Sequence, residues 1–426
     1  MLIAAIAVVA VLLTAQALFS LWLNLYAWDH PERVARTSGP RTLQPPRLSF
    51  SVLLPAHHEQ AVIGETLRKL GATNYPEHLV EVIVVCHESD VETVQAAEFA
   101  IARHRLQNVF IETFSGEPGK PRGLNIGLGV SENDVVCVFD AEDDVHPDIF
   151  DVANSAMQQE GVNVLQAGVQ LVSPADRWFS VHNCLEYFFW FKSRLHFHAR
   201  QGMVPLGGNT VFFRWEVLES VGGWDEACLT EDADIGLRLS AAGERIAVVY
   251  HHEWVTREET PGTVKALVKQ RTRWHQGFLQ VLMKGDWRRL PLLRQRALAL
   301  LTLSAPLLDA TLFVMLPVFV LCAVLVRLPV PVAIITWVPL YAVALQALTS
   351  GVAARMFAAE FGLRVPLLTL VRVPLTYIPY QLLLGASAMR AVSRQLRNQV
   401  NWEKTEHVGA HRVARPVALP GLQDAA

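Results

Sequence analysis

The sequence predicts an α/β domain built on a mostly parallel sheet, with α-helical membrane segments before and after it in the chain. Short apolar runs alternate with helical stretches between residues 48 and 139, and the stretches 1–28 and 328–354 contain no Asp, Glu, Lys, Arg or His. Only 18% of the 426 residues are charged, whereas about a quarter is usual in soluble domains. With a mean hydropathy of +0.26, these patterns exclude a purely soluble enzyme.

The charge balance and the cysteines exclude two further classes. The 37 Lys and Arg and the 40 Asp and Glu leave a formal net charge of −3. Nucleic-acid binding is dominated by a strongly positive protein surface, so no nucleic acid is expected as a partner. The five cysteines form no Cys-x-x-Cys pair, which argues against a disulfide framework and a cysteine metal site. A reducing, cytoplasmic setting is expected for the soluble part.

Residues 1–28 form the first expected element, an N-terminal transmembrane helix. Roughly 20 helical residues cross a hydrocarbon core of about 30 Å. A cleaved signal peptide is the alternative, but no Lys or Arg precedes the apolar run, and Trp22, Tyr26 and Trp28 are typical of an interfacial belt. Four arginines and several prolines follow within residues 29–47, which predicts an extended basic linker, not a helix, on the cytoplasmic side.

Alternating strands and helices begin after the linker. The expected strands are 48–54, 80–85, 109–113 and 135–139, and the expected helices are 61–70, 91–103 and 123–129. Continuous apolar strands alternating with helices are typical of a buried parallel sheet with helices on both faces. Ligands bind beyond the carboxyl ends of the strands in such sheets.

Polar residues gather directly after three of the strands, in Pro55–Glu59, His87–Asp90 and Asp140–Asp144. Each alone is compatible with an ordinary solvated turn, but all three are expected at the same edge of the sheet. The segment Asp140–Asp144 holds four carboxylates, which repel one another unless a bound cation or protonation reduces their negative charge. Mg²⁺ or Mn²⁺ bound with a diphosphate explains this turn. Lys120 lacks the Walker spacing, so a P-loop is excluded.

Seven short motifs occur in order along the middle of the chain. They are Pro55–Glu59, Gly119–Asn125, Asp140–Asp143, Leu206–Asn209, Gly222–Asp225, Thr230–Asp232 and Gln270–Trp274. In this order and spacing the chain resembles the membrane-embedded family 2 glycosyltransferases, the group of the cellulose, chitin-oligosaccharide, poly-N-acetylglucosamine and hyaluronan synthases. The resemblance spans roughly residues 48–277 and the flanking membrane architecture.

The resemblance implies a nucleotide-sugar-binding GT-A fold over residues 48–290 and inversion at the anomeric carbon of an activated sugar. Asp140 and Glu142 match the Asp-x-Asp motif, which holds the donor diphosphate through Mg²⁺ or Mn²⁺, although Glu replaces the second Asp. Asp143 is the alternative metal ligand. Asp232 matches the carboxylate that takes the proton from the acceptor hydroxyl.

The other matched residues divide into a donor set and an acceptor set. The expected donor-binding residues are Pro55, Ala56, Glu59, Glu88, Asp90, Lys120, Asp140, Gln270, Arg273 and Trp274. The expected acceptor-binding residues are Gly207, Gly208, Asn209, Glu231 and Trp274. Many relatives carry Asp-Asp after the second strand, where the first Asp meets uracil, but Cys86 and His87 stand here. Glu88 and Asp90 are the available substitutes, so the nucleotide stays open, with a UDP-sugar as the expected donor.

The chemistry agrees with these roles. A sugar hydroxyl is a poor nucleophile and needs a carboxylate base within reach, and the departing diphosphate needs positive charge, which Arg273 and Lys120 supply together with the metal. Trp274 offers a flat face on which a sugar ring stacks. Alternatively, Asp232 caps a helix, Trp274 is an interfacial anchor, and Arg273 extends towards lipid headgroups.

The remaining segments are expected at the membrane. The aromatic and basic stretch 178–200 predicts an amphipathic interface helix, with a buried core helix as the alternative, and a second interface helix is expected near 262–285. Apolar runs at 310–326 and 328–354 predict a transmembrane hairpin. A further run at 373–389 fits either a full span or an interface helix, so residues 297–392 bring the total to three or four spans. Residues 393–426 are expected to form a C-terminal tail.

The leading hypothesis is therefore an inverting hexosyltransferase of the cell membrane. It crosses the membrane several times and has a cytoplasmic catalytic domain. This domain extends a β-linked polysaccharide processively and couples extension to export, so polysaccharide export proteins are possible partners. A non-processive transferase to a lipid carrier or glycolipid is the alternative enzyme. An inactive scaffold of a polysaccharide assembly complex is the alternative of another class. The partners are a nucleoside-diphosphate sugar, a glycan or lipid-linked acceptor, and the bilayer.

Overall fold

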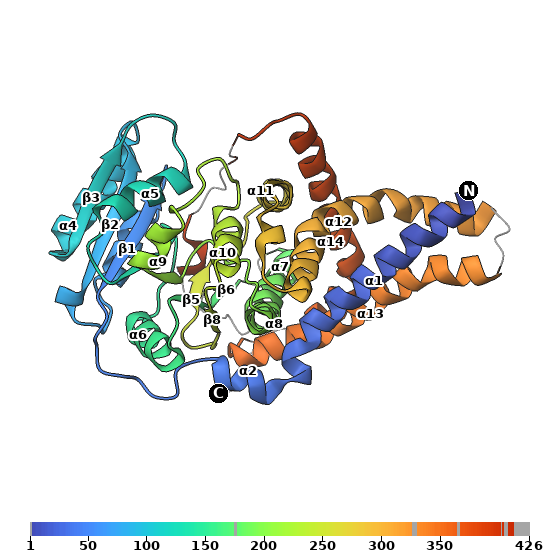
Figure 1. Ribbon diagram of the computed structural model, residues 1–426, viewed down its shortest axis with the longest axis horizontal. Helices are drawn as coiled ribbons and strands as arrows, with labels where there is room; N and C mark the ends of the chain where they lie inside the picture. Colours follow the sequence, from blue (N-terminus) through green and yellow to red (C-terminus); the bar gives the residue numbers. More distant parts are fainter. Residues whose placement is uncertain are drawn as a thin grey trace, which may run out of the picture.

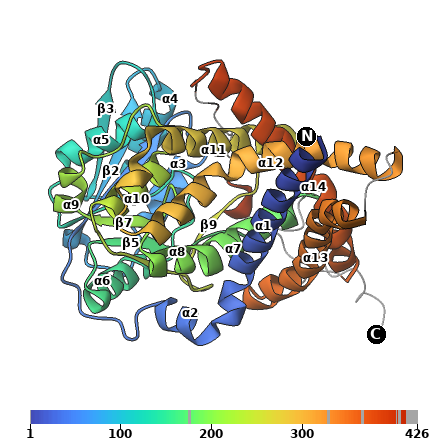
Figure 2. The ribbon, with the colours of Figure 1, turned by 45° about the vertical axis from the view of Figure 1, so that its right-hand side comes forward.

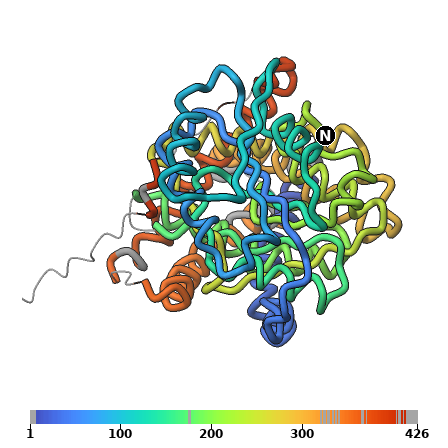
Figure 3. The backbone as a smooth tube through the Cα atoms, turned by 90° about the vertical axis from the view of Figure 1, so that its left-hand side faces the viewer, coloured from blue at the N-terminus to red at the C-terminus, as the bar shows by residue number. Residues whose placement is uncertain are grey.

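An α/β domain and a group of long apolar helices lie at opposite ends of the molecule (Figure 1). The computed structural model describes residues 2–173, 177–325, 330–363, 367–401, 403 and 408–412. In Figure 3 the first part of the α/β domain, coloured blue to cyan, faces the viewer. The apolar helices extend away from the sheet, so the α/β domain meets them along one side only.

Seven strands form the central sheet in the order β3-β2-β1-β4-β7-β5-β8. Their bounds are β1 Phe50–Ala56, β2 Val80–His87, β3 Val109–Phe114, β4 Val135–Val138, β5 Val164–Ala167, β7 Val211–Arg214 and β8 Ile246–Val249. All neighbouring pairs are parallel except those of β7, which is antiparallel to β4 and β5. The mostly parallel sheet expected from the sequence is therefore confirmed.

Helices cover both faces of this sheet. In the first half they are α3 Ile63–Leu70, α4 Val91–His104, α5 Lys120–Val130 and α6 Ile149–Glu160, and a short 3₁₀ turn at Glu77–Leu79 precedes β2. A cluster of fully buried aromatic rings, Phe50, Phe139, Phe150 and Phe212, lies under the centre of the sheet. Burial of continuous apolar strands on both faces explains why they read as unbroken Val, Ile and Leu runs.

The second half of the domain carries the remaining short elements. They are β6 Val169–Leu171, α9 Trp215–Ser220, α10 Glu231–Ala241, β9 Thr256–Glu258, α11 Val264–Lys284 and a 3₁₀ turn at Asp286–Arg289. The strands β6 and β9 pair in parallel as a separate two-stranded sheet. The helix expected near 262–285 is α11, and it packs against the C-terminal helix α14 (Leu367–Leu396).

The aromatic segment is helical and mostly buried, which agrees with the alternative of a core helix, while its position at the bilayer interface stays a prediction. It comprises α7 Ser180–Phe189, a π-helical turn at Trp190–Arg194 and α8 Leu195–Gln201. Figure 2 shows α7 and α8 between the sheet and α1. Phe188 and Phe191 are buried and join the core beneath the sheet, while Phe188 also packs on Phe357 of an apolar helix. Aromatic residues therefore fill the junction between the domain and the apolar helices.

Three helices are long and apolar enough to cross a membrane within the described part of the chain. The candidate spans are Ala7–Asp29, Leu293–Val318 and Tyr341–Glu360. They belong to α1 Leu2–Asp29, α12 Leu293–Leu325 and α13 Val330–Glu360. The turn expected between the last two lies partly outside the described residues. The segment 373–389 is part of α14, which does not meet the same criterion, so three candidate spans agree with the lower expected number.

Two connecting segments differ from the structures expected for them, an extended linker at 29–47 and a C-terminal tail at 393–426. The prediction of an extended linker at 29–47 is wrong for residues 31–37, which form the helix α2, Pro31–Thr37. A helix can start here because Pro31 stands at the first helical position, where a missing N–H costs nothing.

After α14 the chain returns to the α/β domain, and a 3₁₀ turn at Ala410–Arg412 follows. Arg412 donates hydrogen bonds to the carbonyls of Val62 (2.8 Å) and Asp143 (2.9 Å). Residues 404–407 and 413–426 of the expected tail lie outside the described part.

Candidate active site

A cavity of about 1380 Å³ opens beyond the carboxyl ends of the parallel strands. The turns after β1 and β4 contribute to its lining, as do His87 at the end of β2, residues 206–209, the start of α10 and one side of α11. The expectation that the polar turns share one edge of the sheet is thus confirmed. The parallel register of these strands places the turns side by side.

The end of the cavity at which the donor is expected begins at the turn after β1. Pro55, Ala56 and Glu59 line it as expected, and His57 lines it with them. Glu88 and Asp90 are not among the lining residues, but His87 is. The sequence pointed to the right turn after β2 but to the wrong side chains within it, because spacing does not reveal which way successive side chains face.

Asp90 instead holds two turns together. Its carboxylate accepts the N–H of His58 (2.5 Å) and caps α4 by accepting the N–H of Thr93 (3.4 Å). Burial alone would raise the pKa of Asp90, but these hydrogen bonds take the pKa below its ordinary value. Asp90 is therefore an ionised carboxylate in a buried position.

The acidic turn after β4 presents two of its carboxyl groups to the cavity. Asp140 and Glu142 line it, whereas Asp143 is fully buried. Both oxygens of Asp143 accept hydrogen bonds from the Asn209 amide (2.8 and 3.0 Å), and Oδ2 also accepts the N–H of Asp140 (2.8 Å). Burial, with the neighbouring acids, raises the pKa of Asp143 well above its usual value. Asp140 and Glu142 thus offer the oxygen pair that suits a hard divalent cation.

Lys120 lies at the first turn of α5 and reaches across the cavity. Its ammonium donates to Asp140 Oδ1 (2.5 Å) and to the carbonyl of Gly208 (2.9 Å), and Glu231 lies 3.9 Å away. Burial alone would lower the pKa of Lys120, but Asp140 and Glu231 raise the pKa above its ordinary value. A permanent positive charge therefore stands beside the acidic turn.

The start of α10 supplies two acids to the same cavity, the buried Glu231 and the half-buried Asp232. Thr230 occupies the N-cap position and its side chain makes no capping bond, and Asp232 stands at the second helical position. Asp232 Oδ1 accepts the N–H of Ala233 (2.8 Å) and the side chain lines the cavity. Burial raises the pKa of Asp232, and burial likewise raises the pKa of Glu231 to about 7. A carboxyl with a raised pKa at a cavity wall is suited to accept a proton.

The segment 206–209 brings these groups within reach of one another. A β-carbon at Gly208 would stand 3.3 Å from Asp232 Oδ2 and 3.4 Å from Lys120 Nζ, so the Asp232 carboxylate and the Lys120 ammonium flank the same point. The amide of Asn209 also donates to Glu258 (2.6 Å). Glu258 lines the cavity from β9, which the paired backbone of Asp144 and Arg257 holds against the acidic turn. No local sequence signal marks Glu258, because a long-range pairing places it.

The helix α11 places its three expected residues on the cavity wall. Gln270, Arg273 and Trp274 all line the cavity, and the Trp274 ring lies 4.2 Å from the Arg271 guanidinium carbon. Arg273 donates to the backbone carbonyl of Glu403 (3.0 Å). Within the described residues, Gln270 Oε1 is buried with no hydrogen-bond partner. A hydroxyl or amide of a bound ligand would satisfy this oxygen.

The cavity continues between the apolar helices. Polar side chains line this part from α1, α12, α13 and α14: Gln16, Ser20, Asn24, Asp309, Gln346, Thr349, Ser350, Tyr377 and Gln381. Arg194 donates to Asn24 Oδ1 (2.7 Å) and Ser20 Oγ (2.6 Å), and Tyr377 donates to Gln346 Oε1 (2.8 Å). Burying polar side chains among apolar helices costs free energy, so such side chains usually serve a function. They extend a hydrophilic surface from the acidic site into the helical part.

The fold and the site together define a class, a GT-A glycosyltransferase. The mannosyltransferase PcManGT of Pyrobaculum calidifontis, solved with GDP-Man and Mn²⁺, has a similar fold with a TM-score of 0.55 and 17% sequence identity, over 92% of this chain and 99% of that one. The sequence model of the "Glycosyltransferase like family 2" matches residues 45–277. The chain belongs to the family 2 glycosyltransferases, which confirms the expected family and that the protein is an enzyme.

Two of the relatives are named for different products. The chain is 28% identical to the probable glycosyltransferase YdaM of Bacillus subtilis, over 55% of this chain and 56% of that one. It is 29% identical to the β-monoglucosyldiacylglycerol synthase of Trichormus variabilis (54% and 49%) and 23% identical to the poly-β-1,6-N-acetyl-D-glucosamine synthase of Staphylococcus epidermidis (59% in both). The chain spans about half the length of the curated relatives that it matches.

Proposed function

We propose that the protein transfers a hexosyl unit, with inversion, from a nucleoside-diphosphate sugar to a glycan acceptor at the membrane. One observation carries the proposal: a single cavity joins the acidic donor end near Asp140 to the polar surface between the apolar helices. Donor and acceptor can therefore meet at one point, beside Asp232.

Asp232 is the proposed base. Its carboxylate takes the proton from the acceptor hydroxyl as that oxygen attacks the anomeric carbon, and the nucleoside diphosphate leaves on the opposite side. Lys120 and Arg273 lie at the same cavity and offset the charge that develops on the departing diphosphate. Pro55, Ala56, His57 and Glu59 line the nucleotide end.

Asp140 and Glu142 are the proposed ligands of Mg²⁺ or Mn²⁺. When bound, such an ion would neutralise diphosphate charge. The Mn²⁺ bound to the mannosyltransferase of Pyrobaculum calidifontis supports this proposal. Asp143 supports the turn through its bonds to Asn209 and the Asp140 N–H, rather than as a ligand.

The polar lining between the helices favours a growing glycan as the acceptor, because sugar hydroxyls need hydrogen-bond partners along their path. Processive extension coupled to export is the function proposed for this surface. Transfer to a glycolipid is the second candidate, and the 29% identity to a β-monoglucosyldiacylglycerol synthase favours it. An inactive scaffold is not supported by a site with Asp232, Lys120 and Arg273 in place.

The candidate spans and the arginines of the linker support a multi-pass cell-membrane protein with a cytoplasmic catalytic domain. A reporter near Arg41 is then expected in the cytoplasm. An exterior position would overturn this orientation, since nucleotide sugars are made in the cytoplasm.

The acceptor is tested by incubating the purified protein in bilayers with a panel of labelled UDP- and GDP-sugars. A water-soluble product of many residues supports the glycan proposal, and a product that partitions into organic solvent with one added sugar supports the glycolipid alternative. Absence of transfer from every sugar of the panel would contradict both. The Asp232→Asn variant is the blank for each reaction.

A further inference from the structure

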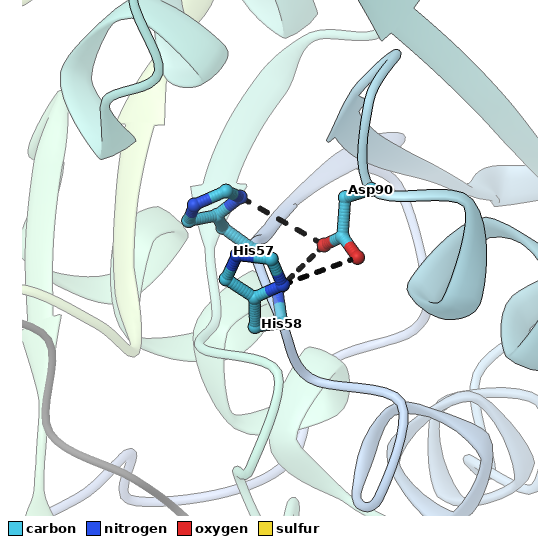
Figure 4. A group of neighbouring side chains, drawn as sticks. All are labelled: His57, His58 and Asp90. Carbon is cyan, nitrogen blue, oxygen red and sulfur yellow. Dashed lines mark hydrogen bonds and ion pairs between the residues drawn. The ribbon is translucent and has the colours of Figure 1, made fainter.

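Two histidines and an aspartate meet beside the nucleotide end of the cavity (Figure 4). His57 and His58 follow β1, and Asp90 follows β2. One ligand atom from each lies within 4.8 Å of the others. The transferase chemistry proposed above uses none of these three side chains as acid, base or cation ligand.

The backbone brings the two imidazoles to the same side. Successive side chains of an extended strand point to opposite faces, but His58 has φ of +57°, in the left-handed region that non-glycine residues seldom adopt. The ring centroids of His57 and His58 consequently lie 4.1 Å apart. Both Nδ1 atoms face the Asp90 carboxylate, at 3.8 Å from His57 and 3.5 Å from His58.

These separations are close to those of a tetrahedral metal site. Metal–ligand bonds of about 2.1 Å place two ligand atoms of a tetrahedron about 3.4 Å apart. The two measured nitrogen–oxygen distances, 3.8 and 3.5 Å, exceed that edge by a few tenths of an ångström. His57 Nδ1 is measured to Oδ2 and His58 Nδ1 to Oδ1, so a small rotation of the carboxylate or of one ring would bring a single oxygen and both nitrogens onto one ion.

Asp90 retains the capacity to bind such an ion. Each carboxylate oxygen has two acceptor sites, and the N–H groups of His58 and Thr93 use one on each oxygen. These hydrogen bonds also fix the orientation of the carboxylate, as outer partners of metal ligands commonly do.

We propose that His57, His58 and Asp90 form a transition-metal site of the Zn²⁺ class, separate from the hard-cation site at Asp140 and Glu142. Imidazole nitrogens suit Zn²⁺ and its neighbours in the first transition row, whereas carboxylates alone suit Mg²⁺ and Mn²⁺. The fourth position is left for water. The site is independent of the identity of the transferred sugar and of the acceptor.

The site has a consequence for the donor, because His57 also lines the cavity. A bound ion draws the His57 ring towards Asp90 and fixes the turn after β1. Micromolar Zn²⁺ is therefore expected to raise the KM for the nucleotide sugar several-fold. The effect is expected to vanish in a variant that lacks the site.

The experiment uses the full-length protein in detergent, stripped of metal and then kept in millimolar Mg²⁺ to fill the hard-cation site. Co²⁺ is titrated first, because tetrahedral Co²⁺ absorbs visible light much more strongly than octahedral Co²⁺, and Zn²⁺ is then used to displace it. The variants are His58→Asn, since Asn tolerates the left-handed backbone, and His57→Gln. His78→Gln, at an exposed histidine of the same domain, is the matched control.

The wild-type protein and His78→Gln are expected to bind one Co²⁺ with tetrahedral absorption, which one equivalent of Zn²⁺ abolishes. Loss of an outer partner of a metal ligand alone costs about 10- to 100-fold in affinity, so each of the two variants at the site should bind Zn²⁺ at least about 100-fold more weakly. A wild-type protein that gives only octahedral Co²⁺ absorption overturns the proposal without recourse to any variant. Unchanged Zn²⁺ affinity in both His57→Gln and His58→Asn overturns it as well.

Discussion

Replacement of Asp232 by asparagine tests the proposed base most directly. Asp232 lies at the second helical position of α10 and accepts the N–H of Ala233 at 2.8 Å. Asparagine has nearly the same volume and keeps an oxygen for that hydrogen bond, but it cannot accept the proton of the acceptor hydroxyl. The variant should therefore fold and bind donor nucleotide as the wild type does.

The expected loss lies in the chemical step. General-base catalysis contributes a factor of about 100 to 10,000 in rate, which corresponds to about 2.7–5.4 kcal/mol of barrier. Burial raises the pKa of Asp232. The acid side of the pH profile of kcat/KM should therefore have its midpoint above the ordinary pKa of an aspartate. This part of the profile should be missing from the residual activity of Asp232→Asn, because the base that titrates has been removed.

Asp234→Asn is the matched control on the same helix. Asp234 is buried and pairs with Arg238 (2.8 Å) and Lys284, and it is not among the residues that line the cavity. Its removal leaves two cations with a missing partner and should cost about 1–3 kcal/mol of stability, with little change in kcat. The assay is initial-rate sugar transfer from labelled donor, together with nucleotide binding and thermal unfolding of each variant.

The two variants should thus show opposite patterns: Asp232→Asn loses turnover and keeps stability, whereas Asp234→Asn loses stability and keeps turnover. Near-normal kcat/KM in Asp232→Asn would refute the assignment of the base. Lost donor binding together with a large fall in Tm would show instead that Asp232 supports the structure, and it would refute the reasoning from the asparagine's retained oxygen.

Three further predictions follow from the same cavity and its surroundings. Excess chelator should abolish transfer and added Mn²⁺ or Mg²⁺ should restore it, while Asp140→Asn should need more metal for half-maximal rate; full activity in chelator would contradict this. Burial raises the pKa of Glu231 from 4.5 to about 7, so the stability tied to its protonated form is present below pH 4.5 and is lost as the pH rises through 7. Glu231→Gln should therefore raise the Tm of the ligand-free protein more at pH 8 than at pH 5, and an equal change at both would contradict the assigned shift. A β-carbon at Gly277 would lie 2.4 Å from the Thr230 side chain, so Gly277→Ala should destabilise by about 1–3 kcal/mol; Gly129→Ala, which meets no atom within 4 Å, is the control and should not lower the Tm.

Local sequence sufficed for the first half of the sheet. Each expected strand from 48 to 139 agrees with β1–β4 within about two residues, because a buried parallel strand must be a continuous apolar run bounded by polar turns. The same local logic predicted the three turns at the cavity, since parallel strands bring their carboxyl ends to one edge. The N-terminal candidate span was likewise visible, because about 20 uncharged residues suffice to cross a bilayer. The other two candidate spans, Leu293–Val318 and Tyr341–Glu360, only partly overlap the expected runs 310–326 and 328–354.

Tertiary structure decided the matters that depend on distant partners. Strand β7 enters antiparallel between β4 and β5, and β9 brings Glu258 to the acidic turn. The aromatic segment at 180–201 became a buried junction because the sheet and the apolar helices cover it from two sides, which its own composition cannot reveal.

The site shows the same division between sequence and structure. Resemblance to the family motifs pointed to Asp140, Glu142 and Asp232, and each lines the cavity, at the end of a strand or the start of a helix. It could not distinguish Glu142, which faces the cavity, from Asp143, which Asn209 holds in the interior. Side-chain direction in a turn depends on backbone torsions and on the partners that the whole fold supplies, and these exist only after distant segments have packed together.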